Sequence, residues 1–167
     1  MYWFTNATQP IALTLPVLSS RHGYAKAQSA LIDAYKSLAE PAGSLAVTEL
    51  KRLLRGRSPL LRSSSVAEHF ASRLGPDEKA MINRLIELNR LDITMAVEIN
   101  QLAMRGAEKR GFTTVMNDWL VAAPHVVEVI NRMTTALAAY RLARAEGRSH
   151  DDATQYAADS VFRTQLD

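Results

Sequence analysis

The residues best suited to chemistry are the four histidines, since a neutral imidazole can bind a metal or move a proton. They stand at His22, His69, His125 and His150, and none belongs to an HExxH motif or to another spacing typical of a metal site. His125 and Glu128 are spaced so that both lie on one face of a helix. A di-metal carboxylate bundle requires a second pair of this kind, and the sequence contains none. The histidines therefore predict no metal centre.

The pair His150-Asp151 raises a second option, because adjacent His and Asp residues ligate metals in metal-dependent phosphohydrolases. No further histidine motif completes such a ligand set. A helix start explains the same residues, with Ser149 as the N-cap and acidic residues in the first turn. Glycine-rich phosphate loops, G-x-S-x-G elbows and paired catalytic carboxylates are also missing from the sequence. We therefore predict a protein that is not an enzyme and takes no cofactor.

The composition fits one globular domain over residues 1–167. Of the 167 residues, 47% are hydrophobic and 22% are charged, which is enough for a buried core. The net charge of +3 is too small to make phosphate binding the leading explanation. The absence of cysteine excludes disulfides and thiolate chemistry. No apolar run reaches the roughly 20 residues of a membrane span, and the first residues lack the basic region of a signal peptide.

Helical periodicity dominates the sequence, and no alternating run rich in Val, Ile and Thr indicates a strand. The spacing of Ala27, Leu31, Ala34 and Leu38 marks the apolar side of a first helix. The chain is therefore predicted to be all-α, a compact bundle of about six helices. They are expected over residues 24–40, 44–55, 66–74, 76–105, 112–123 and 125–146, with a last helix after Ser149.

Prolines and glycines set the predicted boundaries between these helices. Pro41 and Gly43 should end the first helix, so that Ser44 caps the second one. Pro124 should kink or end the helical stretch over residues 112–146.

Two segments lack a helical pattern. Residues 1–23 combine aromatic side chains with two prolines, which predicts an extended arm lying over the helical body. Residues 51–65 contain basic residues, no acidic one, and the helix breakers Gly56 and Pro59, which predicts a basic linker. A solvated loop is the simplest interpretation of this linker, and its leucines favour a membrane surface over a nucleic-acid duplex as a ligand. The candidates for contact with phosphates are Lys51, Arg52, Arg55, Arg57 and Arg62.

Polar side chains inside an apolar helix face form another candidate site. The helix predicted over residues 76–105 has a wide apolar face, and Asp92 falls within it, with Asn89 and Asn100 close by. One interpretation is a buried polar network with a function. A local helix irregularity or a pairing with an arginine explains the same residues more simply.

The segment NRMTTALAAYRLAR, residues 131–144, has small or apolar residues on nearly every side. Ala138, Ala139 and Leu142 lie outside the stripe that faces the core, so we expect them to contact a second neighbour. The arm or the helix after Ser149 would be that neighbour, which makes these residues a candidate helix–helix interface.

Two stretches carry a resemblance to a known family. The stretch NATQPIALTLPVLSSRHGYAKAQSAL (6–31) resembles the Asn-x-Thr-Gln, Leu-Pro-Val-Leu and Lys-Ala elements of very large bacteriophage and prophage proteins of the PLxRFG type. The stretch NRMTTALAAYRLARAEGRSHDDATQYAADSVFRTQLD (131–167) is similar to their Asn-Arg, Ala-Ala-Tyr-Arg-Leu-Ala and Val-Phe elements. These proteins are related to virion internal or ejection proteins and to the large polyvalent protein associated helical domains.

The resemblance implies a segment excised from a longer chain, located in the virion interior and delivered to the host cell. It implies a non-catalytic interaction or structural module of a virion or genome-ejection protein. Its partners would be other domains of the same chain or other virion proteins, and a homo-oligomer is a further option. As the alternative function, the basic residues 51–62 would contact a membrane surface or nucleic acid during genome delivery.

Overall fold

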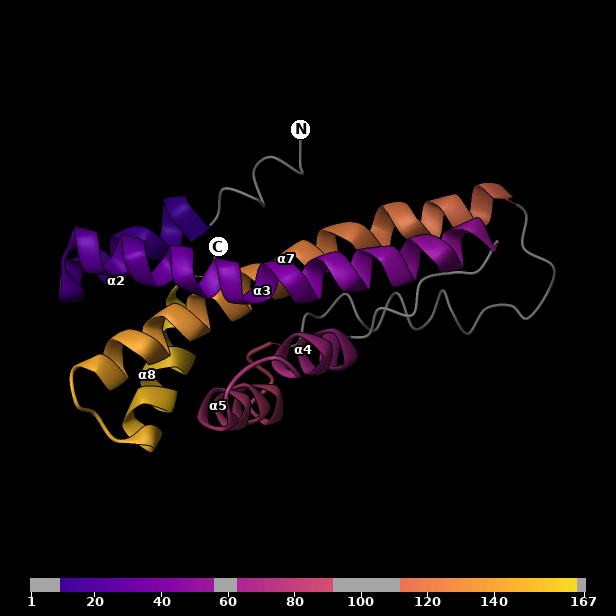
Figure 1. Ribbon diagram of the computed structural model, residues 1–167. Helices are drawn as coiled ribbons and strands as arrows, with labels where there is room; N and C mark the ends of the chain where they lie inside the picture. The colour runs from indigo at the N-terminus through magenta and orange to yellow at the C-terminus, as the bar shows by residue number, and fades with distance from the viewer. Residues whose placement is uncertain (1–9, 56–62, 92–111, 165–167) are drawn as a thin grey trace.

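The computed structural model describes residues 10–55, 63–91 and 112–164, and over these ranges the chain is an all-α bundle (Figure 1). A short π-helical turn, η1 (Pro10–Thr14), precedes the α-helices. The predicted fold class is therefore confirmed. The α-helices of the described ranges are α2 (Leu15–His22), α3 (Tyr24–Leu54), α4 (Ser63–Ala71), α5 (Pro76–Glu87), α7 (Phe112–Ala145) and α8 (His150–Arg163).

Helix α7 is the centre of the bundle. Figure 1 shows it running antiparallel to α3, and it also contacts α8, α4, α5 and η1. Every residue from Met133 to Tyr140 is buried, including the polar Thr134 and Thr135. The Thr135 hydroxyl hydrogen-bonds the Thr14 hydroxyl of η1 at 2.8 Å, so η1 is attached to the central helix. A helix buried on all sides must have neighbours on all sides, which explains its small and apolar residues.

The turn between α7 and α8 agrees with the sequence prediction. Gly147 has φ +80°, and the Arg148 N–H donates to the Ala143 carbonyl at 3.2 Å, as in a Schellman motif. The Ser149 side chain then accepts a hydrogen bond from the Asp152 N–H at 3.1 Å. This N-cap begins α8, which returns along α7.

The extended arm predicted over residues 1–23 is wrong for the part that the structure describes. Residues 10–22 are helical, and α2 packs against α3 after a reversal at Gly23, whose φ is +82°. Leu15, Leu18 and His22 are buried on one side of α2. Their spacing is helical, but the prolines at positions 10 and 16 obscured it, because Pro is tolerated in a first helical turn.

Helix α3 does not end at Pro41, which corrects the two helices predicted over 24–40 and 44–55. Ser44 is inside the helix, and its hydroxyl donates to the Pro41 carbonyl at 2.9 Å instead of capping a new helix. Pro41 is itself buried, and α3 packs along α7. Packing of this kind offsets the roughly 3 kcal/mol that an interior proline costs a helix.

Two further helix predictions are also corrected. Helix α7 continues through Pro124 as one helix from Phe112 to Ala145, because it packs along α3 over this length. Helix α5 ends at Glu87, far short of the predicted end at residue 105. Asn89 adopts φ +53°, and the Arg90 N–H donates to the Leu85 carbonyl at 2.9 Å, which is a second Schellman ending. The rest of that predicted helix lies outside the described residues.

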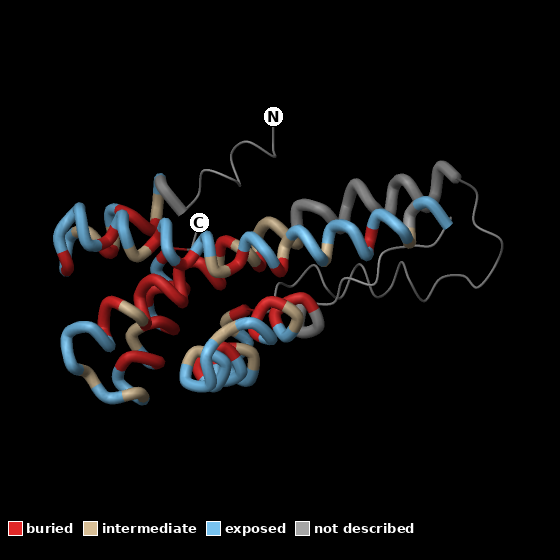
Figure 2. Tube along the Cα trace, in the orientation of Figure 1, coloured by how far each residue is buried: buried red, intermediate tan, exposed pale blue. Residues whose placement is uncertain are grey.

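The predicted linker over residues 51–65 has different bounds in the structure. Lys51–Leu54 form the last turn of α3, and α4 begins at Ser63. Residues 56–62 lie outside the described part of the chain. Figure 2 shows that buried residues concentrate in α7, α8, α4 and α5, whereas the second half of α3 is largely exposed. The bundle thus has a covered centre and an exposed flank.

Candidate functional site

The basic residues predicted to contact phosphates lie at the end of α3. Lys51 and Arg55 are exposed, and Arg52 is partly buried beside the Glu49 carboxylate, with 3.7 Å between the nearest atoms. Arg57 and Arg62 lie outside the described residues. The structure therefore places Lys51, Arg52 and Arg55 on one helical turn.

The three residues predicted as a helix–helix interface are buried within the chain itself. Ala138 and Ala139 are 0% exposed, and Leu142 is 8% exposed. They belong to the part of α7 that α3, α8 and η1 surround. These residues are covered by the same chain and offer no surface to another molecule.

The buried polar network predicted around Asn89 is wrong for that residue. Asn89 is exposed, and its positive φ ends α5. Asparagine tolerates this left-handed conformation better than most residues, which gives it a role in the turn. The other two members of the predicted network, Asp92 and Asn100, lie outside the described residues.

A polar cluster that the sequence analysis missed joins α2, α7 and α8. The His22 side chain is only 1% exposed, and its Nδ1 lies 2.6 Å from a Glu146 carboxylate oxygen. Its Nε2 lies 2.8 Å from the Tyr156 hydroxyl. The guanidinium groups of Arg21 and Arg148 each lie 5.0 Å from the centre of the Tyr156 ring. The His22 imidazole of α2 therefore contacts both α8 and the residue that directly follows α7.

The carboxylate of Glu146 is stabilised in its charged form. Its pKa is lowered mainly by the hydrogen bond from His22, and burial opposes this effect. The positive charges of His22 and Arg148 lower the pKa further, and Arg148 lies 3.1 Å from the second carboxylate oxygen. Both oxygens of Glu146 thus have partners on this chain.

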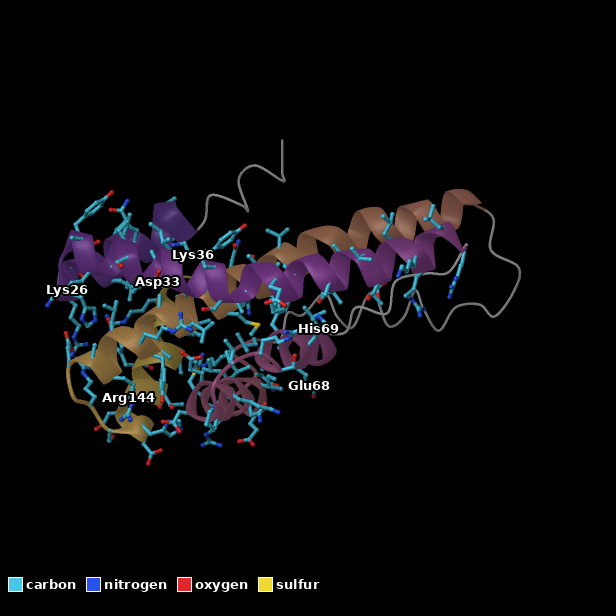
Figure 3. All side chains as sticks on the ribbon, viewed as in Figure 1. Lys26, Asp33, Lys36, Glu68, His69 and Arg144 are labelled. Carbon is cyan, nitrogen blue, oxygen red and sulfur yellow. The ribbon has the colours of Figure 1, made fainter. Side chains whose placement is uncertain are left out.

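An open groove of about 350 Å³ lies beside the cluster, between α3 and the end of α7. Its walls include Lys26 and Asp33, labelled in Figure 3, together with Arg141 and His22. Arg141 is engaged by Glu78 at 2.7 Å and by the Ser37 hydroxyl at 3.1 Å. A general base needs a free ring nitrogen, and both nitrogens of His22 are occupied. The groove therefore has charged walls without an available proton acceptor at His22.

A second histidine–tyrosine pair closes α8 against α7. The Tyr140 hydroxyl hydrogen-bonds Nδ1 of His150 at 2.8 Å, and burial raises the pKa of Tyr140. His150 and Asp151 line an open cleft of about 490 Å³ together with Arg84 of α5. Within the described ranges, no group of three or more His, Cys, Asp or Glu residues is arranged to hold a metal ion.

His69 has a packing role under α3. Its Nε2 lies 3.2 Å from the Pro41 carbonyl oxygen and 3.0 Å from the Ser44 hydroxyl, and Figure 3 shows it on the side of α4 that faces α3. The Pro41 carbonyl thus receives a side-chain contact from another helix. This contact attaches α4 to the middle of α3.

The largest exposed apolar feature of the described residues is one face of α3. Of the eight large apolar side chains that are exposed in those ranges, six belong to this helix. At about 100° per residue they fall within an arc of about 140°, on the side that does not face α7. We call this surface the outer face of α3. It consists of Tyr24, Ile32, Tyr35, Val47, Leu50 and Leu54, with the small exposed residues Ala25, Ala39, Gly43 and Ala46 between them.

The exposed fractions along the outer face are large. They range from 47% at Ile32 to 79% at Leu54. So many exposed large apolar side chains on one side of a helix are typical of a site of contact with another molecule. The sequence analysis found the inner apolar side of this helix but did not single out the outer one.

In the described ranges, no helix combines the length and the hydropathy required to cross a bilayer. Comparisons of the chain with protein-family models, with curated proteins and with solved structures give no match.

Proposed function

We propose that this chain is a non-catalytic helical interaction module that docks onto a protein partner through the outer face of α3. The observation that carries this proposal is the row of exposed apolar side chains, such as Tyr35 and Leu50, along one helix. Burial of apolar surface drives most protein association, at about 25 cal/mol per Å² before the costs of binding. Burial of the outer face against a partner would therefore lower the free energy of the chain.

A non-catalytic role agrees with the chemistry of the best polar cluster. His22, Glu146 and Tyr156 use their polar atoms on one another, and this cluster connects three helices. Such a network stabilises a fold without offering a nucleophile or a base to a substrate.

We further propose that the module belongs to a large phage-encoded virion or genome-ejection protein and is located in the virion interior before delivery to the host. The resemblance of residues 6–31 and 131–167 to such proteins supports this assignment. The partner would then be another domain of the same long chain or another virion protein.

Site-specific photo-crosslinking tests the interaction role. A benzophenone amino acid replaces Tyr35 on the outer face, and in a matched control it replaces Phe162, an exposed aromatic residue of α8. We expect crosslinked protein products in cells that carry the gene with the probe at position 35, and fewer with the probe at position 162. If position 35 yields no crosslinked protein, the interaction role is contradicted.

The alternative function rests on the exposed Lys51 and Arg55, which lie beside the exposed Leu50 and Leu54. A basic and apolar helix end suits an anionic membrane surface or nucleic acid. Binding to anionic vesicles and to DNA across a salt series tests it, because contacts with phosphates weaken as the salt concentration rises. Salt-sensitive binding that is lost in the variant K51A/R55A would support the alternative over the protein partner.

A further inference from the structure

We propose that the outer face of α3 pairs with the same face of a second copy of this chain, with the two helices antiparallel and crossing at Gly43. This inference rests on the proposed interaction role and names the partner. It follows from how residue size and charge are distributed along the helix.

Large apolar side chains stand towards both ends of the outer face. They are Ile32 and Tyr35 on one side and Leu50 and Leu54 on the other. Small residues lie close to Gly43, at Ala39 and Ala46, and an added Cβ at Gly43 would meet no neighbouring side chain. Small residues at the centre allow two helices to approach closely.

An antiparallel pair centred on Gly43 places two pairs of apolar residues opposite one another. Ile32 and Leu54 each stand about 16 Å from Gly43 along the helix axis, on opposite sides. Ile32 of one copy would therefore lie opposite Leu54 of the other. Ala39 would lie opposite Val47 in the same way. Each contact occurs twice, as a two-fold interface requires.

Opposite charges beside the outer face favour the antiparallel arrangement. Asp33 lies along the flank of the first half of the face, and Lys51 and Arg55 lie along the same flank of the second half. In the antiparallel pair, Asp33 of one copy falls between Lys51 and Arg55 of the other. In a parallel pair Asp33 would lie far along the helix axis from Lys51 and Arg55 of the other copy, so this contact between opposite charges would be absent.

The remaining charged residue near the centre of the face fits this arrangement. Lys36 would lie opposite Leu50 of the second copy, where its aliphatic stem covers the leucine while the ammonium group reaches water. The face between Ile32 and Leu54 is about 33 Å long, which is comparable to a small domain. The helix thus offers a surface whose length and charges are complementary to a second copy.

Analytical ultracentrifugation of the purified full chain over a concentration series tests dimer formation. We expect a reversible dimer for the wild type. In the variant Val47→Glu we expect dimerisation to weaken by more than about tenfold, because a charge would be buried opposite Ala39 of the second copy without a partner. The matched control Leu88→Glu changes an exposed leucine directly after α5 and should leave the dimer unchanged. A wild-type chain that stays monomeric at every concentration overturns the proposal.

Charge reversal and disulfide trapping test the orientation. Asp33→Lys should weaken the dimer, and the double reversal D33K/K51D should restore part of it. Since the chain has no cysteine, Gly43→Cys should give a disulfide-linked dimer under mild oxidation, whereas Leu54→Cys should not. Crosslinking through Leu54→Cys as well as through Gly43→Cys would indicate a parallel pair and overturn the model of the interface.

The outcomes also separate this inference from the proposed function. A monomer whose Tyr35 probe crosslinks to a different protein overturns self-pairing and keeps the interaction role. A monomer with no crosslinked product contradicts both. A monomer that floats with anionic vesicles and is released by salt overturns self-pairing in favour of a membrane ligand.

Discussion

The two sides of α3 are both apolar, but only one of them is covered by this chain. The inner side places Ala27, Leu31, Ala34 and Leu38 against the bundle, where none is more than 8% exposed. The outer face places tyrosines and branched aliphatic residues in contact with solvent, each at least 47% exposed. The same helix therefore contributes a core and an uncovered surface. Apolar residues alone do not define the interior of this molecule.

The comparison shows that one side of this helix stabilises the bundle, and the opposite side is free for the interaction that we propose. The inner side is small and regular, with alanine and leucine at helical spacing, as close packing against α7 requires. The outer face is rich in tyrosine and large aliphatic residues, which are favoured where a surface is buried on binding. Three predictions compare covered with exposed positions, first within α3 and then also in the turn after α7.

The largest effect is expected from the same truncation on the two sides. Leu38→Ala removes a side chain that is 1% exposed and should lower the free energy of unfolding by about 2–5 kcal/mol. Leu50→Ala removes a side chain that is 52% exposed and should change the stability by less than about 0.5 kcal/mol. Urea unfolding at a protein concentration too low for dimers measures both. Equal losses would contradict the division of α3 into two sides.

Smaller effects are expected when two glycines are replaced by alanine, and the two changes in stability should have opposite signs. Gly147→Ala places a Cβ at φ +80° and should destabilise the chain by about 1–2 kcal/mol. Gly43→Ala lies inside α3 with open space around it, and it should stabilise the chain by about 0.5–1 kcal/mol. Thermal unfolding of both variants provides the measurement. A loss of stability at Gly43 would show that the outer face is not open at its centre.

The smallest effect is expected at the edge of the covered region, where Glu146 pairs with His22. The pKa of Glu146 is lowered in the folded chain, so its contribution to stability is complete above the ordinary value of 4.5 and is lost as the pH falls through the lowered value. The difference in unfolding free energy between the wild type and Glu146→Gln should therefore shrink on acidification.

Urea unfolding from neutral pH to about pH 3 measures this difference. Glu40→Gln is the matched control, because Glu40 is a 74% exposed carboxylate of α3 with a surface partner, Arg73. A pH-independent difference for Glu146→Gln would show that the His22 contact does not affect the ionisation of Glu146.

Much of the fold could be predicted from local pattern. The buried positions in the first half of α3 follow helical spacing, and Ser149 caps the last helix with its side chain. These features depend on residues a few positions apart, which a single sequence displays directly. The continuation of α3 through Pro41 and of α7 through Pro124 could not be predicted in this way, because packing against a distant helix decides whether a proline ends a helix.

The candidate sites were harder to predict for the same reason. His22 and Glu146 are separated by 124 positions, and only the fold brings them to 2.6 Å. The helical spacing of Leu15, Leu18 and His22 was the one local sign that this histidine is buried. The outer face of α3 required the knowledge that α7 covers one side only, and hydrophobic periodicity does not contain that information.

Pro41 has a consequence for the motions of α3. Proline has no N–H, so it cannot donate to the carbonyl of Ser37, and the hydrogen-bond ladder of the helix is interrupted near its middle. The half before Pro41 is held by α2 and by the covered centre of the bundle, whereas the half after it is largely exposed. We expect amide hydrogen exchange to be slower before Pro41 than after it. Helix α3 would then be continuous in shape but divided into two units of cooperative opening, and the binding of a second molecule would slow exchange in the weaker unit most.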